Sequence, residues 1–210
     1  MRYPTGERQM YRWRRMTPAE REQALACRRE QRLPLHSPPH YASDTSFYLI
    51  TAACYEHRSI IGHSSERMAD FKASLVDVLR QVCQAVHAWT VLPNHYHALV
   101  QALDVKGLLS ALGRLHGRTS FEWNGQEQRR GRKVWCNAAE TAMKSERHYW
   151  ASLLYVLHNA VKHGYVEQWQ HWPFCNAAAW LEEVGRERAE RIWREFPIDD
   201  FGATWDPPEL

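Results

Sequence analysis

The sequence lacks the features that mark a secreted, disulfide-bonded or membrane-spanning protein. It has five cysteines, an odd number, and no two of them form a C-x-x-C pair. Scattered cysteines are typical of reduced thiols and argue against a disulfide scaffold or a zinc knuckle. The N-terminus has no apolar signal-peptide core, and no apolar run is long enough to cross a membrane. We therefore expect a cytoplasmic protein with no membrane partner.

Charge is distributed unevenly along the 210 residues. Residues 1–35 hold nine arginines against four glutamates, and residues 114–133 hold six basic side chains against two glutamates. Residues 181–210 reverse the balance, with nine acidic side chains against four arginines. Two basic segments indicate a polyanionic partner, which an acidic tail could shield, although a solvated surface would give the same counts.

Hydrophobic patterns predict an α+β domain. Strands are expected at 46–53, 87–92, 95–102 and, as shorter pieces, 133–136 and 141–144. Helices are expected at about 64–86, 104–123, 145–163 and 176–195, with a packing loop at 169–174. A sheet that contains a hairpin, with helices on its face, has the ferredoxin-like fold as its closest simple layout.

The chain divides by composition into three parts. Residues 1–45 form a basic N-terminal extension, 46–175 the domain, and 176–210 a C-terminal helix with an acidic tail. In the extension, Thr17 and Glu20 have the spacing of a capping box, which predicts a helix to about Gln31. Three arginines before it either grip phosphates or coat a surface helix: Arg12, Arg14 and Arg15.

Two histidines stand out in the second strand of the predicted hairpin. His95 and His97 follow a Pro-Asn turn and lie two residues apart. Side chains alternate faces along a strand, so both imidazoles point to the same side and Tyr96 points to the other. Two imidazoles on one rigid strand are half of a metal site, which needs a third ligand from elsewhere.

A helix can supply the rest of that site. Tyr155 and Asn159 lie four residues apart on the 145–163 helix and so share a face. If this helix packs across the histidine strand, the amide oxygen of Asn159 becomes the third ligand and the phenol of Tyr155 lies beside the metal. Such a set suits Mg²⁺ or Mn²⁺ and leaves positions for phosphate oxygens. The phenol would then attack a phosphodiester as nucleophile.

Each part also has a plain structural interpretation. An H-x-H pair on a strand is more often two hydrogen-bonded histidines than a metal site. A tyrosine on an apolar helix is usually a core residue, and an asparagine near a helix end can simply cap it. Tyr96 and Tyr149 are rival nucleophiles, but Tyr96 faces away from the histidines and Tyr149 lies on another helix face.

The two motifs together resemble a known family. Residues 91–97 (VLPNHYH) and 155–164 (YVLHNAVKHG) look like the paired signatures of single-tyrosine HUH transposases, most closely the bacterial REP-associated tyrosine transposases. The resemblance covers about residues 40–175. Two departures are Ala160, where the family usually has proline, and Cys136-Asn137, where Gln-Arg is usual; the second puts a DNA contact in doubt.

The resemblance implies a ferredoxin-like HUH endonuclease that cuts and rejoins single-stranded DNA next to palindromic hairpins. It implies that His95 and His97 bind Mg²⁺ or Mn²⁺ with Asn159, and that Tyr155 becomes linked to a DNA 5′-phosphate. It also implies a bacterial protein acting on nucleoid DNA, and it leaves open whether one chain or a homodimer forms the site.

Two alternatives remain: a non-catalytic DNA-binding protein that keeps the fold, and a metal-dependent hydrolase of another phosphodiester. Besides the three N-terminal arginines, the predicted DNA contacts are Arg114, Arg118, Arg129, Arg130, Arg132, Lys133 and Lys162.

Overall fold

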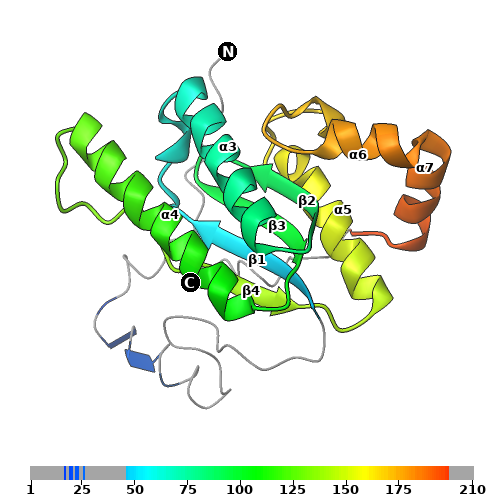
Figure 1. The fold of residues 1–210 in the computed structure, drawn as a ribbon, viewed down its shortest axis with the longest axis horizontal. Helices are drawn as coiled ribbons and strands as arrows, with labels where there is room; N and C mark the ends of the chain where they lie inside the picture. Colours follow the sequence, from blue (N-terminus) through cyan, green and yellow to red (C-terminus); the bar gives the residue numbers. More distant parts are fainter. Residues whose placement is uncertain (1–16, 18, 21, 24–25, 27–45, 199–210) are drawn as a thin grey trace. The chain divides into compact units, whose positions relative to one another are not determined.

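The computed structural model describes residues 17, 19–20, 22–23, 26 and 46–198 (Figure 1). The chain separates into two compact units, one of residues 43–198 and one of residues 1–42 with 199–210. The predicted division at 45 and 175 stays a prediction. In the part of the chain that the structure describes, no helix is both long and apolar enough to cross a membrane.

The four strands form one antiparallel sheet in the order β2-β3-β1-β4. One α-helix connects β1 to β2 and a second connects β3 to β4, so the order of strands and α-helices up to β4 is βαββαβ. This order and connectivity are ferredoxin-like, as the sequence predicts. The elements are β1 (Phe47–Ala53), α3 (Ser65–Val82), β2 (Ala85–Val91), β3 (His95–Gln101), α4 (Val105–Gln126) and β4 (Ala139–Ala142).

The two faces of the sheet carry different layers. Tyr96, Ala98 and Val100 of β3 belong to a buried cluster with Phe71 of α3 and Leu112 of α4. Their neighbours His95 and His97 point to the opposite face because side chains alternate along a strand. That face is covered by α5 (Glu146–Lys162), whose apolar side chains are buried (Figure 1). The helix therefore lies where it can reach the histidines.

Side-chain caps fix where α3, α4 and α5 begin. Ser64 accepts a hydrogen bond from the amide of Arg67 at the start of α3, and Ser145 accepts one from the amide of His148 at the start of α5. Asp104 caps α4 in the same way. At the other end of α5, Gly164 has a φ of 71°, the left-handed conformation expected of a residue just past a helix.

The predicted capping box of the N-terminal extension is present. The hydroxyl of Thr17 accepts a hydrogen bond from the amide of Glu20, and the carboxylate of Glu20 accepts one from the amide of Thr17. Residues 19–20, 22–23 and 26 are helical. The remainder of this helix and its predicted end near Gln31 lie outside the described residues.

Several predicted boundaries were wrong. The helix expected to reach Val86 ends at Val82, because Cys83 is extended and β2 begins two residues later. The helix expected over 176–195 is two helices, α6 (Ala177–Val184) and α7 (Arg186–Glu195). Gly185 separates them with a φ of 81°, a left-handed conformation that a continuous helix cannot contain.

Two other segments are less regular than expected. The strand expected at 133–136 is a single bridge between Trp135 and Cys54, and β4 begins two residues before its predicted start. The loop at 169–174 contains the short helix η3 (Trp169–His171), and the indole of Trp172 donates to the carbonyl of Val91. This loop packs against the sheet, as predicted.

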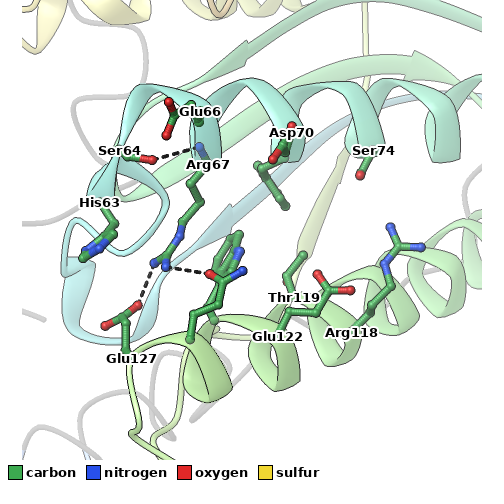
Figure 2. A pocket seen from close by; sticks show the side chains of 13 residues that line it. His63, Ser64, Glu66, Arg67, Asp70, Ser74, Arg118, Thr119, Glu122 and Glu127 are labelled. Atoms are coloured by element: carbon green, nitrogen blue, oxygen red, sulfur yellow. Dashed lines mark hydrogen bonds and ion pairs between the residues drawn. The ribbon is translucent and has the colours of Figure 1, made fainter.

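A cavity of about 360 Å³ lies between α3 and α4, on the side of the sheet away from the histidine pair. At its end, Arg67 donates to Gln126 and forms an ion pair with Glu127 (Figure 2). Hydrogen bonds from Arg132 and Arg67 lower the pKa of Glu127 to about 2. This network ties α3 to the end of α4 and to the loop that follows.

Burial of His116 predicts a loss of stability in mild acid. Its Nε2 lies 3.1 Å from the Tyr96 hydroxyl, and its ring stacks on Trp135. Burial lowers its pKa from 6.5 to about 4. The unfolded chain therefore binds a proton that the folded chain rejects, and stabilisation that is complete above pH 6.5 is lost as pH falls through about 4.

The shift corresponds to at most about 3 kcal/mol. Urea unfolding across this pH window measures it: the decline in the free energy of unfolding becomes shallower in His116→Gln. The exposed His171→Gln is the control and keeps the wild-type slope. Equal slopes for His116→Gln and the wild type would contradict this account.

Candidate active site

His95 and His97 form a close pair of buried imidazoles at the start of β3. Their ring centroids lie 5.0 Å apart, and the two residues are 6% and 3% exposed. The register explains the position: Thr51 and Ala53, at the end of β1, pair with His97 and His95. The rings thus lie at one end of two central strands, on the face that α5 covers.

Oxygen atoms hold the Nδ1 atom of each ring. The Oγ1 atom of Thr51 lies 2.8 Å from Nδ1 of His97, and the Oδ1 atom of Asn94 lies 2.8 Å from Nδ1 of His95. Asn94 is itself fixed, because its Nδ2 donates to the carbonyl of His57. An amide oxygen only accepts, so Nδ1 of His95 carries the proton and its Nε2 presents a lone pair.

Helix α5 brings the two other predicted residues to these rings. The Oδ1 atom of Asn159 lies 3.1 Å from Nε2 of His95, and the phenol oxygen of Tyr155 lies 3.5 Å from Nε2 of His97. The two residues are 0% and 2% exposed. Asn159 follows His95 by 64 residues and Tyr155 follows His97 by 58, and the fold brings all four side chains together.

The contact between His95 and Asn159 joins two acceptors. Nε2 of His95 has no proton to give, and the Oδ1 atom of Asn159 accepts only. The Nδ2 atom of Asn159, which does donate, is buried without a hydrogen-bond partner. Two lone pairs that face each other are the arrangement a cation between them would satisfy. The pair of acceptors therefore fits a bound cation better than a direct hydrogen bond.

Burial keeps both imidazoles neutral. Desolvation, with the nearby His163, Lys162 and His57, lowers the pKa of His97 to about 3. Desolvation also holds the pKa of His95 well below its ordinary value, assisted by His97 and other histidines. A neutral imidazole is the form that binds a metal, and in His95 the proton that Asn94 fixes on Nδ1 directs Nε2 to that role.

Two further histidines lie against the pair and were not singled out from the sequence. The ring of His163 is 4.9 Å from that of His95, and the ring of His57 is 6.2 Å from it. His163 could have been found, because it follows Asn159 by four residues and so lies near it on one helix face. His57 could not, because only the turn after β1 brings it there.

No acidic side chain of the described residues completes a three-ligand metal cluster at the candidate site. Among residues 46–198 and the few described before them, no three histidine, cysteine or acidic side chains are placed to hold a metal ion. A cation between the two imidazoles would therefore take its third protein ligand from the amide of Asn159. Such a set of few ligands leaves coordination positions for water or for phosphate oxygens.

The predicted DNA-contacting residues are scattered. Lys162 lies with its ammonium 4.7 Å from the ring centroid of Tyr155, inside the candidate site. Arg132 is bound to Glu127 and Asn124 and is largely buried. In the loop after α4, Lys133 lies over the ring of Tyr55, Arg130 lies over the ring of Phe121, and Arg129 is exposed. On α4, Arg118 lines the α3–α4 cavity and Arg114 donates to the hydroxyl of Ser110.

The DNA contacts themselves stay predictions. The N-terminal residues Arg12, Arg14 and Arg15 lie outside the described residues. Of the rival nucleophiles, Tyr96 is buried on the opposite face of the sheet. Tyr149 packs against Phe47 and His87, away from the histidine pair.

The fold is shared with a REP-associated tyrosine transposase. A solved structure of that protein, bound to a REP hairpin, matches with a TM-score of 0.53 over 67% of this chain and 82% of the other. The two sequences are 20% identical over the match, so the similarity concerns the fold alone. No family model and no curated protein matches the sequence.

The hydrogen bonds to Asn94 predict which nitrogen of His95 carries the proton. In the metal-free protein at neutral pH, we expect ¹⁵N NMR of the imidazole to show the proton on Nδ1. Asn94→Ala removes the acceptor and should shift the population towards the Nε2 proton. A wild-type ring with its proton on Nε2 would contradict the acceptor pair described here, because that ring would donate to Asn159.

Proposed function

We propose that this protein is a metal-dependent single-stranded DNA endonuclease and strand transferase that acts next to DNA hairpins. The observation that carries the proposal is the convergence of His95 Nε2, His97 Nε2, the Oδ1 atom of Asn159 and the Tyr155 phenol oxygen on one place. Two neutral imidazoles and an amide oxygen are ligands for Mn²⁺ or Mg²⁺, and a phenol beside them is a nucleophile of suitable reach.

The proposed reaction replaces the phosphodiester bond of DNA with a bond between its 5′-phosphate and Tyr155, and then reverses this step with a second strand. His95, His97 and Asn159 would hold a divalent cation, which would supply Lewis-acid polarisation of the phosphodiester. Tyr155 attacks phosphorus with its phenol oxygen and loses its proton, while the bond from phosphorus to the 3′-oxygen breaks. That oxygen takes up a proton and leaves as a 3′-hydroxyl, and the 5′-phosphate stays on Tyr155. Attack by the 3′-hydroxyl of a second strand reverses these steps and rejoins DNA.

The surroundings of Tyr155 fit an anionic substrate. The Lys162 ammonium over the phenol ring places a positive charge where a phosphate would arrive. The basic loop of residues 129–133 follows α4, and its exposed Arg129 and Lys133 can hold a DNA backbone through charge. The similar fold with a REP hairpin bound supports hairpin DNA as the partner.

One observation favours a second candidate, a DNA-binding protein that keeps this fold and does not cut. Tyr155 is 2% exposed, so a strand reaches its phenol only after covering side chains such as Lys162 move. In this alternative the histidine pair is structural. Binding would then be indifferent to metal ions, and no covalent product would form.

Covalent trapping distinguishes the two candidates. Incubation with Mn²⁺ and an end-labelled hairpin oligonucleotide should give a protein–DNA adduct that survives denaturing electrophoresis. Tyr155→Phe should abolish it, because the nucleophilic oxygen is gone. Tyr149→Phe is the matched control, since it removes a half-buried phenol from the same helix, and should retain the adduct. An adduct that persists in Tyr155→Phe would assign the nucleophile elsewhere.

Substitution of His95 should impair metal-dependent cleavage and leave DNA binding largely intact. We expect His95→Ala to lose adduct formation while keeping most of its affinity for the hairpin, because phosphate contacts to arginine and lysine dominate affinity. Fluorescence anisotropy measures the binding, and thermal unfolding confirms that the variant is folded. Equal loss of cleavage and binding in a folded variant would contradict a role limited to the metal.

A further inference from the structure

The turn after β1 has an unusual backbone. It forms the short helix η1 (Tyr55–His57), in which Glu56 has a φ of 60° and His57 a φ of 46°. Two successive residues in the left-handed region, neither of them glycine, are costly, and such strain persists only where the surroundings enforce it. Strained backbone of this kind is concentrated at binding and catalytic sites.

The enforcing contacts come from the candidate active site. The amide of Cys54 donates to the carbonyl of Asn94, and the side chain of Asn94 donates to the carbonyl of His57. The same Asn94 side chain holds the ring of His95. On the other side, the amide of Tyr55 donates to the carbonyl of Val134. The turn is thus built against the histidine pair and the end of the basic loop.

The product of this strained turn is an exposed aromatic ring next to the site. Tyr55 is 37% exposed, and the ammonium of Lys133 lies 4.7 Å from its ring centroid. Tyr55 is two residues before His57, whose ring contacts His95. An aromatic face paired with an exposed lysine is the chemistry that binds a nucleotide: the ring stacks on the base and the lysine neutralises the phosphate.

We propose that Tyr55 and Lys133 form a platform for one base of the single-stranded DNA beside the bond that is cut. The inference rests on the proposed function and adds a positioning residue to it. Lys133 leaves the Tyr55 ring to contact the phosphate, and the base takes its place on the ring. Stacking is tolerant of sequence, so the platform positions the strand without selecting its bases.

Phe121, in the helix layer on the other side of the sheet, provides a matched control. Phe121 of α4 is 69% exposed and has the guanidinium of Arg130 at 4.2 Å from its ring centroid. Like Tyr55, it is an exposed aromatic side chain with a cationic neighbour, and it is the more exposed of the two. It lies on α4, on the side of the sheet opposite to the histidine face, and we expect a strand held at the active site to leave it untouched.

A double-mutant cycle between protein and DNA tests the platform. The probe is a palindromic DNA hairpin with single-stranded tails on both sides, together with copies that carry one abasic site at each tail position in turn. Binding is measured by fluorescence anisotropy at low salt with EDTA, so that no cleavage occurs. The proteins are the full-length wild type, Tyr55→Ala, Tyr55→Phe and Phe121→Ala, each checked for its melting temperature.

We expect Tyr55→Ala to weaken binding of the intact probe by about 5- to 150-fold, the range of one lost base stack. One abasic position should weaken wild-type binding by a similar factor and have no further effect in Tyr55→Ala. Tyr55→Phe and Phe121→Ala should bind as the wild type does. Lys133→Gln, which keeps the ring, should weaken all probes to the same extent.

Three results would overturn the inference. They are an unchanged affinity in Tyr55→Ala, losses that add at every abasic position, and an equal loss in Phe121→Ala. The proposed function is judged separately, by the covalent adduct: adduct formation without coupling at Tyr55 overturns only the platform. A wild-type protein that binds no hairpin probe overturns both.

Discussion

The packing of α5 across the histidine face of the sheet is the constraint on which the candidate site depends. The strand alone gives two imidazoles on one side, which many strands have for structural reasons. The helix adds Tyr155 and Asn159 from one of its faces and seals the rings from water. That burial keeps both imidazoles neutral, and it places an amide oxygen against a nitrogen that has no proton to donate.

Asn94 connects the parts of the site that the chain keeps separate. Its side chain holds the ring of His95 and the carbonyl of His57, and its backbone carbonyl receives the amide of Cys54. Hydrogen bonds to Asn94 therefore tie the start of β3 to the turn after β1. Asn94 and the ring contact between His57 and His95 both link that turn to the metal-ligand candidates, so we expect a base bound at Tyr55 to position the strand for Tyr155.

The sequence predicted those features that follow from local periodicity. Alternation along β3 placed His95 and His97 together, and the four-residue spacing on α5 placed Asn159 beside Tyr155. It could not predict which loop residues complete the site. Thr51 reaches His97 only through the β1–β3 register, and His57 reaches His95 only through a left-handed turn. Both depend on contacts between segments distant in the chain.

The predicted helix boundaries failed for a related reason. Residues 176–195 contain apolar positions at helical spacing, but Gly185 adopts a left-handed conformation and starts a second helix. Arg132 shows the same limit for charged residues. It belongs to a basic segment of the sequence, yet Glu127 and Asn124 hold it in a structural network. The sequence gives the number of basic side chains in a segment, but it does not show which of them are paired with other side chains of the protein.

The central claim is that one cation lies among two imidazoles, an amide and a phenol. A crystal structure soaked in Mn²⁺, with the ion located by anomalous scattering, tests it most directly. The account predicts manganese within bonding distance of His95 Nε2, His97 Nε2 and the Oδ1 atom of Asn159, with the Tyr155 phenol beside it. Manganese elsewhere, or an Asn159 amide that is turned to donate its Nδ2 to His95, would contradict it.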